Sequence, residues 1–310
     1  MPVLEVTHLT KDYGHSRGVF DVSFGVERGE VFGFLGPNGA GKTTTIRHIM
    51  GFSRPQKGET TVEGLDSWRN ADVIQKNLGY LPGEIALPES LTGNQFIKMM
   101  ADLRGVSDMT YTEKLIQKFE LEPTGGLKRM SLGMKRKLAI VTAFMHDPAV
   151  LVLDEPTSGL DPIMQEIFIS FIKEEKSRGK TILLSSHMFP EVDATCDRIA
   201  IIKEGRIIST VVADDLRHNE NKTFKLEFKN KAEFERFREQ VESAGKLNVP
   251  SIKEKYNQVK ITINDKDIDE FFEIVSNYEL KFLSEIKFTL EDYFIKYYDR
   301  DGGEDTNVAN

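Results

Sequence analysis

Cysteine and long apolar segments are scarce in this chain. Its 310 residues include one cysteine, Cys196, so no intrachain disulfide can form and a reducing cytosol fits. No apolar run approaches the roughly 18 residues of a membrane-spanning helix, and stretches such as 199–202 have the length of buried strands. The start, Met1–Glu5, lacks the basic and apolar regions of a secretory signal peptide. We therefore expect a soluble protein.

Positive charge is also in deficit. The chain has 41 Lys and Arg against 49 Asp and Glu, a formal net charge of −8. Binding sites for nucleic acid are usually basic, so we expect nucleic acid not to be the main ligand. Hydrophobic residues make up 39% and charged residues 29%, which is typical of globular proteins. The length allows one large domain and a smaller one.

Residues 36–44 form a complete phosphate-binding motif of the pattern G-x-x-x-x-G-K-[ST]. The apolar run 30–35 before it has strand character, and 42–50 after it can begin a helix. This context separates a true phosphate loop from a glycine-rich turn that happens to precede a lysine. Backbone N–H groups and the helix N-terminus would face a polyphosphate. The residues predicted to bind the nucleotide here are Gly36, Pro37, Asn38, Gly39, Ala40, Gly41, Lys42, Thr43 and Thr44.

Side chains for Mg²⁺ binding and hydrolysis accompany this loop. Lys42 would reach the β- and γ-phosphates, and the Thr43 hydroxyl would ligate Mg²⁺. An apolar strand at 149–153 ends in two carboxylates. Asp154 would hold Mg²⁺ and Glu155 would activate the attacking water as a general base. The alternative is a solvated acidic strand end, but the phosphate loop upstream favours the catalytic interpretation.

Several motifs in order resemble the ATP-binding cassette (ABC) family over residues 1 to about 215. Residues 154–161, Asp-Glu-Pro-Thr-Ser-Gly-Leu-Asp, look like the family's extended Walker B motif and D-loop. Ser-Leu-Gly-Met-Lys at 131–135 resembles its signature motif. His187 is similar to the switch histidine, and Tyr13 matches the aromatic residue that stacks on adenine. The resemblance implies a P-loop NTPase cassette that binds ATP and Mg²⁺.

The resemblance also implies a second subunit. In the family, the signature serine and glycine, here Ser131 and Gly133, contact the γ-phosphate held by the opposite cassette, and Asp161 belongs to the D-loop beside it. His187 would bind the γ-phosphate and fix the water beside Glu155. One phosphate loop and one signature per chain require dimerisation for two complete sites. A C₂ homodimer is the simplest solution, and a related second cassette is the other. Ser131 would also serve as an ordinary helix N-cap.

Two departures from the family pattern stand out. The signature has Leu132 and Met134 where glycine and glutamine are usual, at positions that do not face the phosphate. The glutamine that senses Mg²⁺ and water in the family should follow the strand at 78–82, but Gly83 occupies that position. Glu84 comes next, and we hypothesise that it serves as the substitute.

The pattern of elements predicts an α/β fold. A mostly parallel sheet core is joined by an antiparallel β subdomain, from 1–30 and 58–64, and a helical subdomain within 84–147. Beyond a polar stretch at 216–221 the order β-α-β-β-α-β suggests a small ferredoxin-like α+β module, followed by a helix at 290–298. The expected domains are a cassette at 1–217, an accessory domain at 222–298 and a disordered tail at 299–310.

The expected function is the ATPase subunit of a membrane transporter, docked on separate permease subunits at the cytoplasmic face of the membrane. The segment 80–93 offers apolar side chains where the family meets its permease. The signature variant and the ending at 290–298 resemble a bacterial branch linked to drug, peptide or antibiotic export. The alternatives are a soluble ABC ATPase of translation or DNA repair, and a nucleotide-binding subunit without turnover. The sequence identifies neither the transported substrate nor the direction of transport.

Overall fold

The computed structural model describes residues 2–217, 220–244, 248–286 and 289–298. The tail that the sequence predicts at 299–310 lies outside the described residues. Contacts between Cα atoms divide the chain into two units, 1–213 and 214–310. We describe each unit by itself.

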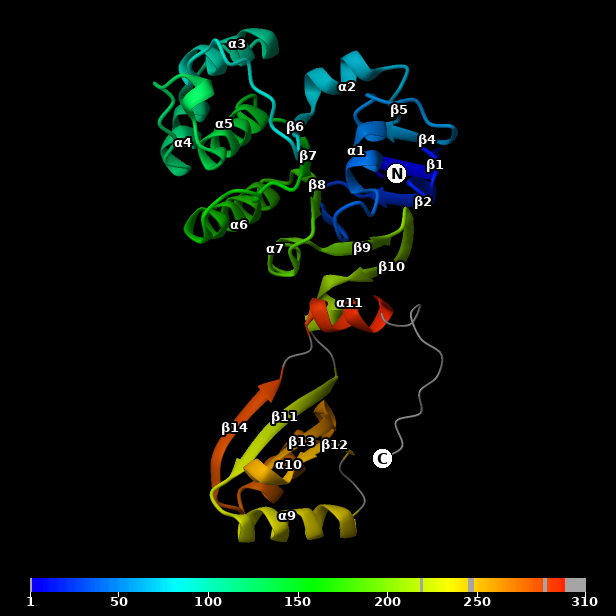
Figure 1. Ribbon diagram of the computed structural model, residues 1–310, viewed down its shortest axis with the longest axis vertical. Coiled ribbons are helices and arrows are strands. Elements are labelled where there is room, and N and C mark those ends of the chain that lie inside the picture. The colour runs from blue at the N-terminus through cyan, green and yellow to red at the C-terminus, as the bar shows by residue number, and fades with distance from the viewer. Residues whose placement is uncertain (1, 218–219, 245–247, 287–288, 299–310) are drawn as a thin grey trace. The chain divides into compact units, whose positions relative to one another are not determined.

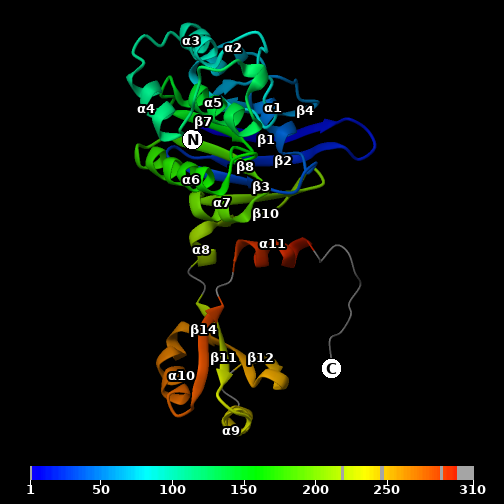
Figure 2. The ribbon, with the colours of Figure 1, turned by 60° about the vertical axis from the view of Figure 1, so that its left-hand side comes forward.

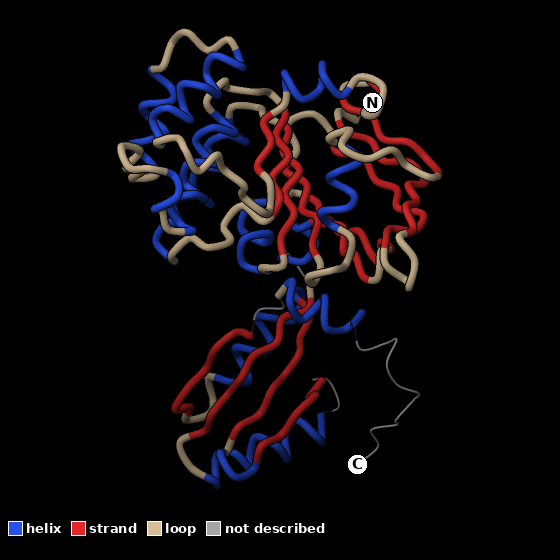
Figure 3. Tube along the Cα trace, turned by 45° about the horizontal axis from the view of Figure 1, so that its top comes forward, coloured by secondary structure: helices blue, strands red, loops and turns tan. Residues whose placement is uncertain are grey.

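A sheet of six strands forms the centre of the first unit, in the order β10-β9-β3-β8-β7-β6. Strands β3, β6, β7, β8 and β9 pair in parallel, and β10 pairs with β9 in antiparallel fashion. Every residue of β3, β7 and β8 is buried, as expected of parallel strands covered on both faces. These strands run side by side between helices (Figure 3). Their bounds are β3 Val31–Leu35, β6 Gly79–Leu81, β7 Val150–Asp154, β8 Thr181–Ser186, β9 Arg198–Lys203 and β10 Arg206–Val212.

A second, antiparallel sheet covers one side of this core. Its order is β2-β1-β4-β5, from β1 Leu4–Asp12, β2 Gly18–Val26, β4 Lys57–Val62 and β5 Leu65–Asp66. Helix α1, Lys42–Ile49, contacts β1, β2 and β4 of this sheet as well as β7 of the central sheet. The apolar faces of both sheets and of α1 share one buried cluster. The helix that follows the phosphate loop is therefore fixed between two sheets.

Helices gather on the side of the central strands away from the antiparallel sheet (Figure 1). They are α3 Gly93–Arg104, α4 Thr110–Lys118 and α5 Leu132–Phe144. Helix α3 begins with a capping box between Thr92 and Gln95 and ends at Gly105, whose φ is 70°. Helices α6 Pro162–Ser177 and α7 Phe189–Thr195 contact each other, and α7 packs on β3 and β8 (Figure 2). The predicted helical subdomain is confirmed.

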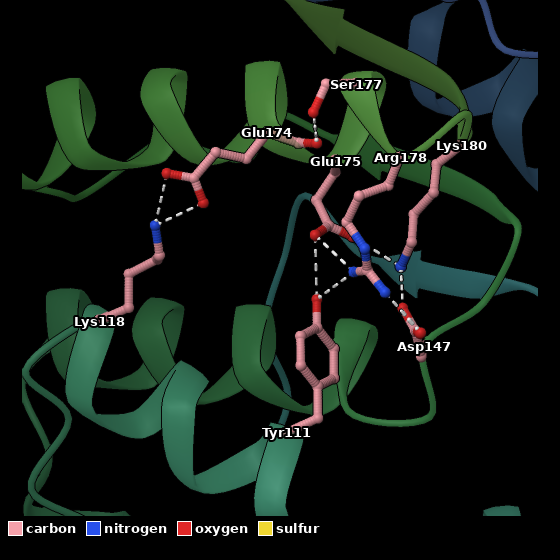
Figure 4. Close-up of polar contacts among 8 residues, drawn as sticks. All are labelled: Tyr111, Lys118, Asp147, Glu174, Glu175, Ser177, Arg178 and Lys180. Atoms are coloured by element: carbon pink, nitrogen blue, oxygen red, sulfur yellow. Dashed lines mark hydrogen bonds and ion pairs between the residues drawn. The ribbon is translucent and has the colours of Figure 1, made fainter.

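A buried network of charges fastens α4 to α6 (Figure 4). The Glu175 carboxylate accepts hydrogen bonds from the Tyr111 hydroxyl at 3.1 Å and from Arg178 at 2.8 Å. Lys180 lies 2.6 Å from the other Glu175 oxygen, and both Lys180 and Arg178 pair with Asp147. Glu175 and Lys180 are almost fully buried. The network therefore joins the helical subdomain to the sheet core.

The second unit contains a sheet of four antiparallel strands that packs with helices α9 and α10. Its order β12-β13-β11-β14, with the chain order β-α-β-β-α-β, is the ferredoxin-like arrangement that the sequence predicts. Alternate residues of β11 and β13 are buried with the apolar faces of the helices. The elements are β11 Asn221–Phe228, α9 Lys231–Ala244, β12 Asn248–Lys253, β13 Gln258–Asn264, α10 Ile268–Val275, β14 Leu280–Ile286 and α11 Leu290–Tyr298.

Across the described parts of the chain, none of the helices combines the length and the apolar character needed to cross a bilayer.

Candidate functional site

The phosphate loop connects β3 to α1 in a conformation that requires glycine. Gly41 precedes the first turn of α1 with a φ of 112°, in the region that side chains disfavour. A Cβ atom on Gly36 would lie 2.4 Å from the Ile202 carbonyl oxygen, so the loop can run this close to β9 only without a side chain. The loop thus places backbone N–H groups and the N-terminus of α1 at the carboxyl end of the sheet.

Lys42 lies inside the loop and is almost fully buried. Its ammonium donates hydrogen bonds to the carbonyl oxygens of Gly36 at 2.5 Å and Pro37 at 3.1 Å. It also lies 3.0 Å from Oε1 of Glu155. The cation is therefore held at the centre of the loop by partners that phosphate oxygens can replace.

The end of β7 brings Asp154 to Thr43. The Thr43 hydroxyl donates a hydrogen bond of 2.8 Å to Asp154 Oδ2, and the Ser185 hydroxyl of β8 donates to Oδ1. Asp154 is completely buried, so these two hydroxyls fix its orientation. The carboxylate and the Thr43 hydroxyl are oxygen ligands of the type that Mg²⁺ prefers.

Glu155 has an unusual backbone conformation. Its φ is 49°, in the left-handed region that non-glycine residues seldom adopt, and its N–H donates to the Ser185 carbonyl at 3.0 Å. Its side chain contacts His187, whose Nδ1 is 2.6 Å from Glu155 Oε2. Such strain is common at functional sites. One carboxylate thus contacts both the loop lysine and the histidine.

These residues border a cavity of about 470 Å³. Its volume is in the range of small-molecule and cofactor pockets. The predicted residues Asn38, Thr43 and Glu84 line it together with the acidic pair and the histidine. The full lining is Asn38, Thr43, Arg47, Tyr80, Pro82, Gly83, Glu84, Asp154, Glu155, Ser158 and His187.

Position 83 lies directly against Asp154. A Cβ atom on Gly83 would be 3.0 Å from Asp154 Oδ2, so glycine allows this close approach. Glu84, the hypothesised substitute for glutamine, is on the wall of the same cavity. Glu84 and the acidic pair therefore line one cavity.

Burial shifts the pKa of two neighbours of the site. Burial and the negative charge of Asp154 raise the pKa of Tyr80 to about 12, so this phenol stays neutral. Burial also raises the pKa of Glu191 to about 7, against the lowering effect of hydrogen bonds from Ser186 and Thr157. Glu191 lies four residues after the predicted switch histidine. Its carboxylate accepts a hydrogen bond of 2.6 Å from the Ser186 hydroxyl.

The remaining predicted residues do not line this cavity. Ser131 is exposed and caps α5, with its Oγ accepting the Met134 N–H at 3.2 Å. Gly133 lies on the first turn of α5, where an added Cβ would be 3.0 Å from the Gly159 carbonyl oxygen. Asp161 caps α6 by accepting the Met164 N–H at 3.0 Å. Tyr13 follows β1 and is half exposed.

Sequence reasoning missed several residues of the site, namely Arg47, Tyr80, Arg136, Ser158 and Ser185. Arg47 lies one turn along α1 from Thr43, so helical spacing from the loop could have identified it. Ser185 lies near the end of β8, two residues before the predicted His187, so its place in the sequence beside that residue could have identified it. Arg136 has no such signal.

The residues present fit a Mg²⁺ ion accompanied by a nucleotide. Asp154 and Thr43 supply one carboxylate and one hydroxyl, and Mg²⁺ commonly takes its other ligands from phosphates and water. In the described part of the chain, no group of three or more His, Cys, Asp or Glu residues is suited to a metal ion. A nucleotide-dependent site does not require such a group.

A phosphate loop between a parallel strand and a helix, with an acidic pair ending another strand of the same sheet, defines a P-loop nucleotide-hydrolysing cassette. The comparisons with known proteins agree. A family model described as "ABC transporter" matches residues 19–158. The chain is 33% identical over 306 residues to "Uncharacterized ABC transporter ATP-binding protein YhcH" of Bacillus subtilis (strain 168), with 95% of each protein covered.

Two further proteins are similar to this chain. "Bacitracin transport ATP-binding protein BcrA" of Bacillus licheniformis is 31% identical over 296 residues, covering 87% of this chain and 96% of that protein. A solved structure described as "Structure of ATP binding subunit of ABC transporter" has a TM-score of 0.64 and 33% identity, and covers 69% of this chain and 92% of its own. The chain belongs to the ABC transporter family and carries its ATPase cassette.

Proposed function

We propose that this chain uses ATP hydrolysis at the 470 Å³ cavity to drive a membrane exporter. The observation that carries the proposal is the contact of Glu155 with both Lys42 and His187, 3.0 and 2.6 Å away, beside the Thr43–Asp154 pair. It joins a phosphate-binding cation, a general base and a metal ligand set in one place. In this proposal residues 1–217 are the cassette and 222–298 an accessory domain.

The proposed roles follow from the chemistry of each group. The loop residues 36–44 bind the phosphates through N–H groups, and Lys42 moves from the carbonyls of Gly36 and Pro37 to the β- and γ-phosphates. Glu155, released from Lys42, accepts a proton from the attacking water. His187 donates a hydrogen bond to the γ-phosphate and orients Glu155. Tyr13 stacks on the adenine ring.

Mg²⁺ belongs to the proposal as a partner of the nucleotide. Thr43 and Asp154 would hold the ion, which would neutralise charge on the transferred phosphoryl group. Ser185 keeps Asp154 in position through its hydrogen bond to Oδ1. Glu84, which lies on the cavity wall, would bind the ion through a water molecule.

We also propose that a second copy of the chain completes the site. Ser131 and Gly133 lie on the first turn of α5 and outside the cavity lining, so another subunit would have to present them to the phosphate. Leu132 and Ile163, beside the signature and the D-loop, are 62% and 71% exposed. Exposed large apolar side chains next to such motifs support burial against a partner. Asp161 would contact the nucleotide across this interface.

The partner in the membrane is proposed to be a permease made of separate subunits, so that the chain lies at the cytoplasmic face. The name of BcrA refers to bacitracin transport, and this supports an exporter of antibiotic-like compounds. Nucleic acid is not expected to bind. The relatives named above are transport proteins, and none of these names refers to translation or DNA repair, so that alternative is not favoured.

Glu155→Gln tests the enzymatic part of the proposal. The variant keeps a hydrogen-bonding side chain of the same size but loses the base, so turnover should fall by about a hundredfold or more while ATP still binds. Binding of a fluorescent ATP analogue and phosphate release would be measured on the full chain. Turnover at the wild-type rate would contradict the assignment of Glu155. Recovery of the tagged protein with ribosomes or DNA, instead of with a membrane permease, would contradict the transport function.

A further inference from the structure

Arg136 lies on α5 and is 2% exposed. Its guanidinium donates three hydrogen bonds, all to backbone carbonyl oxygens. Nη1 donates to Pro82 at 2.8 Å, Nη2 to Gly83 at 2.7 Å, and Nε to Ser158 at 3.0 Å. The side chain therefore uses all three of its guanidinium nitrogens on two segments that are distant from each other in the sequence.

Both segments belong to the proposed hydrolytic site. Pro82 and Gly83 line the cavity, and Gly83 lies directly against Asp154. Ser158 also lines it and follows Glu155 by three residues. Because the three carbonyls converge on one guanidinium, the loop at 82–84 and the start of the D-loop are held at a fixed separation.

Arg136 also connects these segments to the signature. It lies one turn of α5 after Leu132 and five residues after the N-cap Ser131. Its positive charge interacts with the carboxylates of Asp154, Glu155 and Glu191, which partly offset the lowering of its pKa by burial. A displacement of α5 would therefore move the backbone beside Asp154.

We propose that Arg136 is a positioning residue that holds the 82–84 loop and the D-loop in place beside Asp154 and Glu155, and so links the signature end of α5 to the hydrolytic site of the same chain. The proposal rests on the ATPase function proposed above. It explains how a chain with glycine at position 83 keeps this loop against the acidic pair. The loop is fixed through its carbonyl groups, and no side chain at position 83 is needed.

Arg136→Gln and Arg136→Lys in the full chain test this role. A lysine ammonium is a compact charge that cannot reproduce the fork, and a glutamine amide can satisfy at most one of the two segments. We expect kcat to fall about tenfold to a hundredfold in Arg136→Gln, since small misplacements of reacting groups cost this much. Arg136→Lys should lie between this variant and the wild type.

A second measurement does not depend on turnover. ATP affinity would be measured by titration in EDTA and again in Mg²⁺. Binding in EDTA reports the phosphate loop, which Arg136 does not touch, and should stay within about twofold of the wild type. The gain in affinity on adding Mg²⁺ reports the surroundings of Asp154 and should shrink severalfold in Arg136→Gln.

Arg104 provides the matched control. Its Nη1 donates to the carbonyls of Gln75, Lys76 and Leu78 at 2.6, 2.9 and 3.0 Å, and burial lowers its pKa in the same direction. None of these residues lines the cavity. Arg104→Gln should lower the melting temperature but leave kcat and the Mg²⁺ effect unchanged.

The proposal is overturned if Arg136→Gln lowers the melting temperature as Arg104→Gln does, with kcat and the Mg²⁺ effect as in the wild type. Arg136 would then be a structural anchor only. If the wild-type chain itself does not hydrolyse ATP, the proposed function fails. The Mg²⁺ effect on binding still decides the role of Arg136 in that case, because it requires no turnover.

Discussion

At the scale of single residues, the site depends on backbone conformations that most side chains avoid. Gly41 has a φ of 112° and Glu155 one of 49°. A non-glycine residue in the left-handed region costs on the order of 1 kcal/mol or more. Two hydrogen bonds from the Glu155 N–H, to the Ser185 carbonyl and hydroxyl at 3.0 and 3.3 Å, hold this conformation. The strain places one carboxylate between Lys42 and His187.

Glu191 gives a pH prediction at this scale. Its pKa is raised from 4.5 to about 7 by burial, so between these pH values the folded chain binds a proton that the unfolded chain has lost. The free energy of unfolding should therefore fall as the pH rises through about 7, and Glu191→Gln should remove on the order of 2 kcal/mol of this dependence. Urea unfolding at pH 5.5 and pH 8 measures it.

The difference between wild type and Glu191→Gln is the useful quantity. Burial lowers the pKa of His146 to about 4, which stabilises the folded state at rising pH and so acts in the opposite direction. His146 is the same in both proteins, and its effect cancels. Equal pH slopes for the two proteins would contradict the raised pKa of Glu191.

Several residues of the site could be predicted because their motifs are local. The phosphate loop is continuous in sequence, and Asp154 and Glu155 end a recognisable apolar strand. Arg136 could not be predicted, because its role depends on a contact with Gly83, which is 53 residues away. An arginine after the signature looks the same in the sequence whether its side chain faces solvent or binds three carbonyl groups.

At the scale of elements, the helical subdomain predicted within 84–147 is confirmed, and it contains α3, α4 and α5. Asp161 and Pro162 begin α6, and the Thr92–Gln95 capping box begins α3. Helix α2, Ala71–Asn77, was not predicted. It has seven residues with only Ile74 buried, so it shows no apolar period. The position of α1, in contrast, is set by its contacts with both sheets of the first unit.

The network between α4 and α6 supplies a stability prediction (Figure 4). The Glu175 side chain is 3% exposed and its partner Lys180 is 6% exposed. Glu175→Ala leaves Lys180 buried with Asp147 as its remaining partner, and should lower the free energy of unfolding by about 3 kcal/mol. Urea denaturation of the variant measures this loss.

The adjacent residue is the control. Glu174 pairs with Lys118 across the same two helices at 2.7 Å, but its side chain is 54% exposed. An exposed ion pair contributes about 0.2–1 kcal/mol, so Glu174→Ala should cost no more than that. If the two variants were equally stable, the buried network would not be what fastens α4 to α6.

At the scale of the whole molecule, the ATP site in the proposed function is divided between two chains. One half comprises Asp154, Glu155 and His187, which line the cavity, and Lys42, which contacts Glu155. The other half, Ser131 and Gly133, lies at the start of α5 and would act on the nucleotide of a partner. In the proposed function, hydrolysis controls the association of two cassettes, and a permease uses that movement.

Complementation between two inactive variants tests this division most directly. Lys42→Ala damages the cavity half. Ser131→Asp places a negative charge against the phosphate and keeps a good N-cap for α5. Each variant alone should be inactive. When the two variants are mixed in equal amounts and pair at random, about half of the dimers contain one copy of each and have one intact site of two. Turnover should therefore return to about a quarter of the wild-type rate. The control mixture of Lys42→Ala with Glu155→Gln damages the same half twice and should stay inactive. A Lys42→Ala and Ser131→Asp mixture no more active than its separate components would contradict a site shared between two copies.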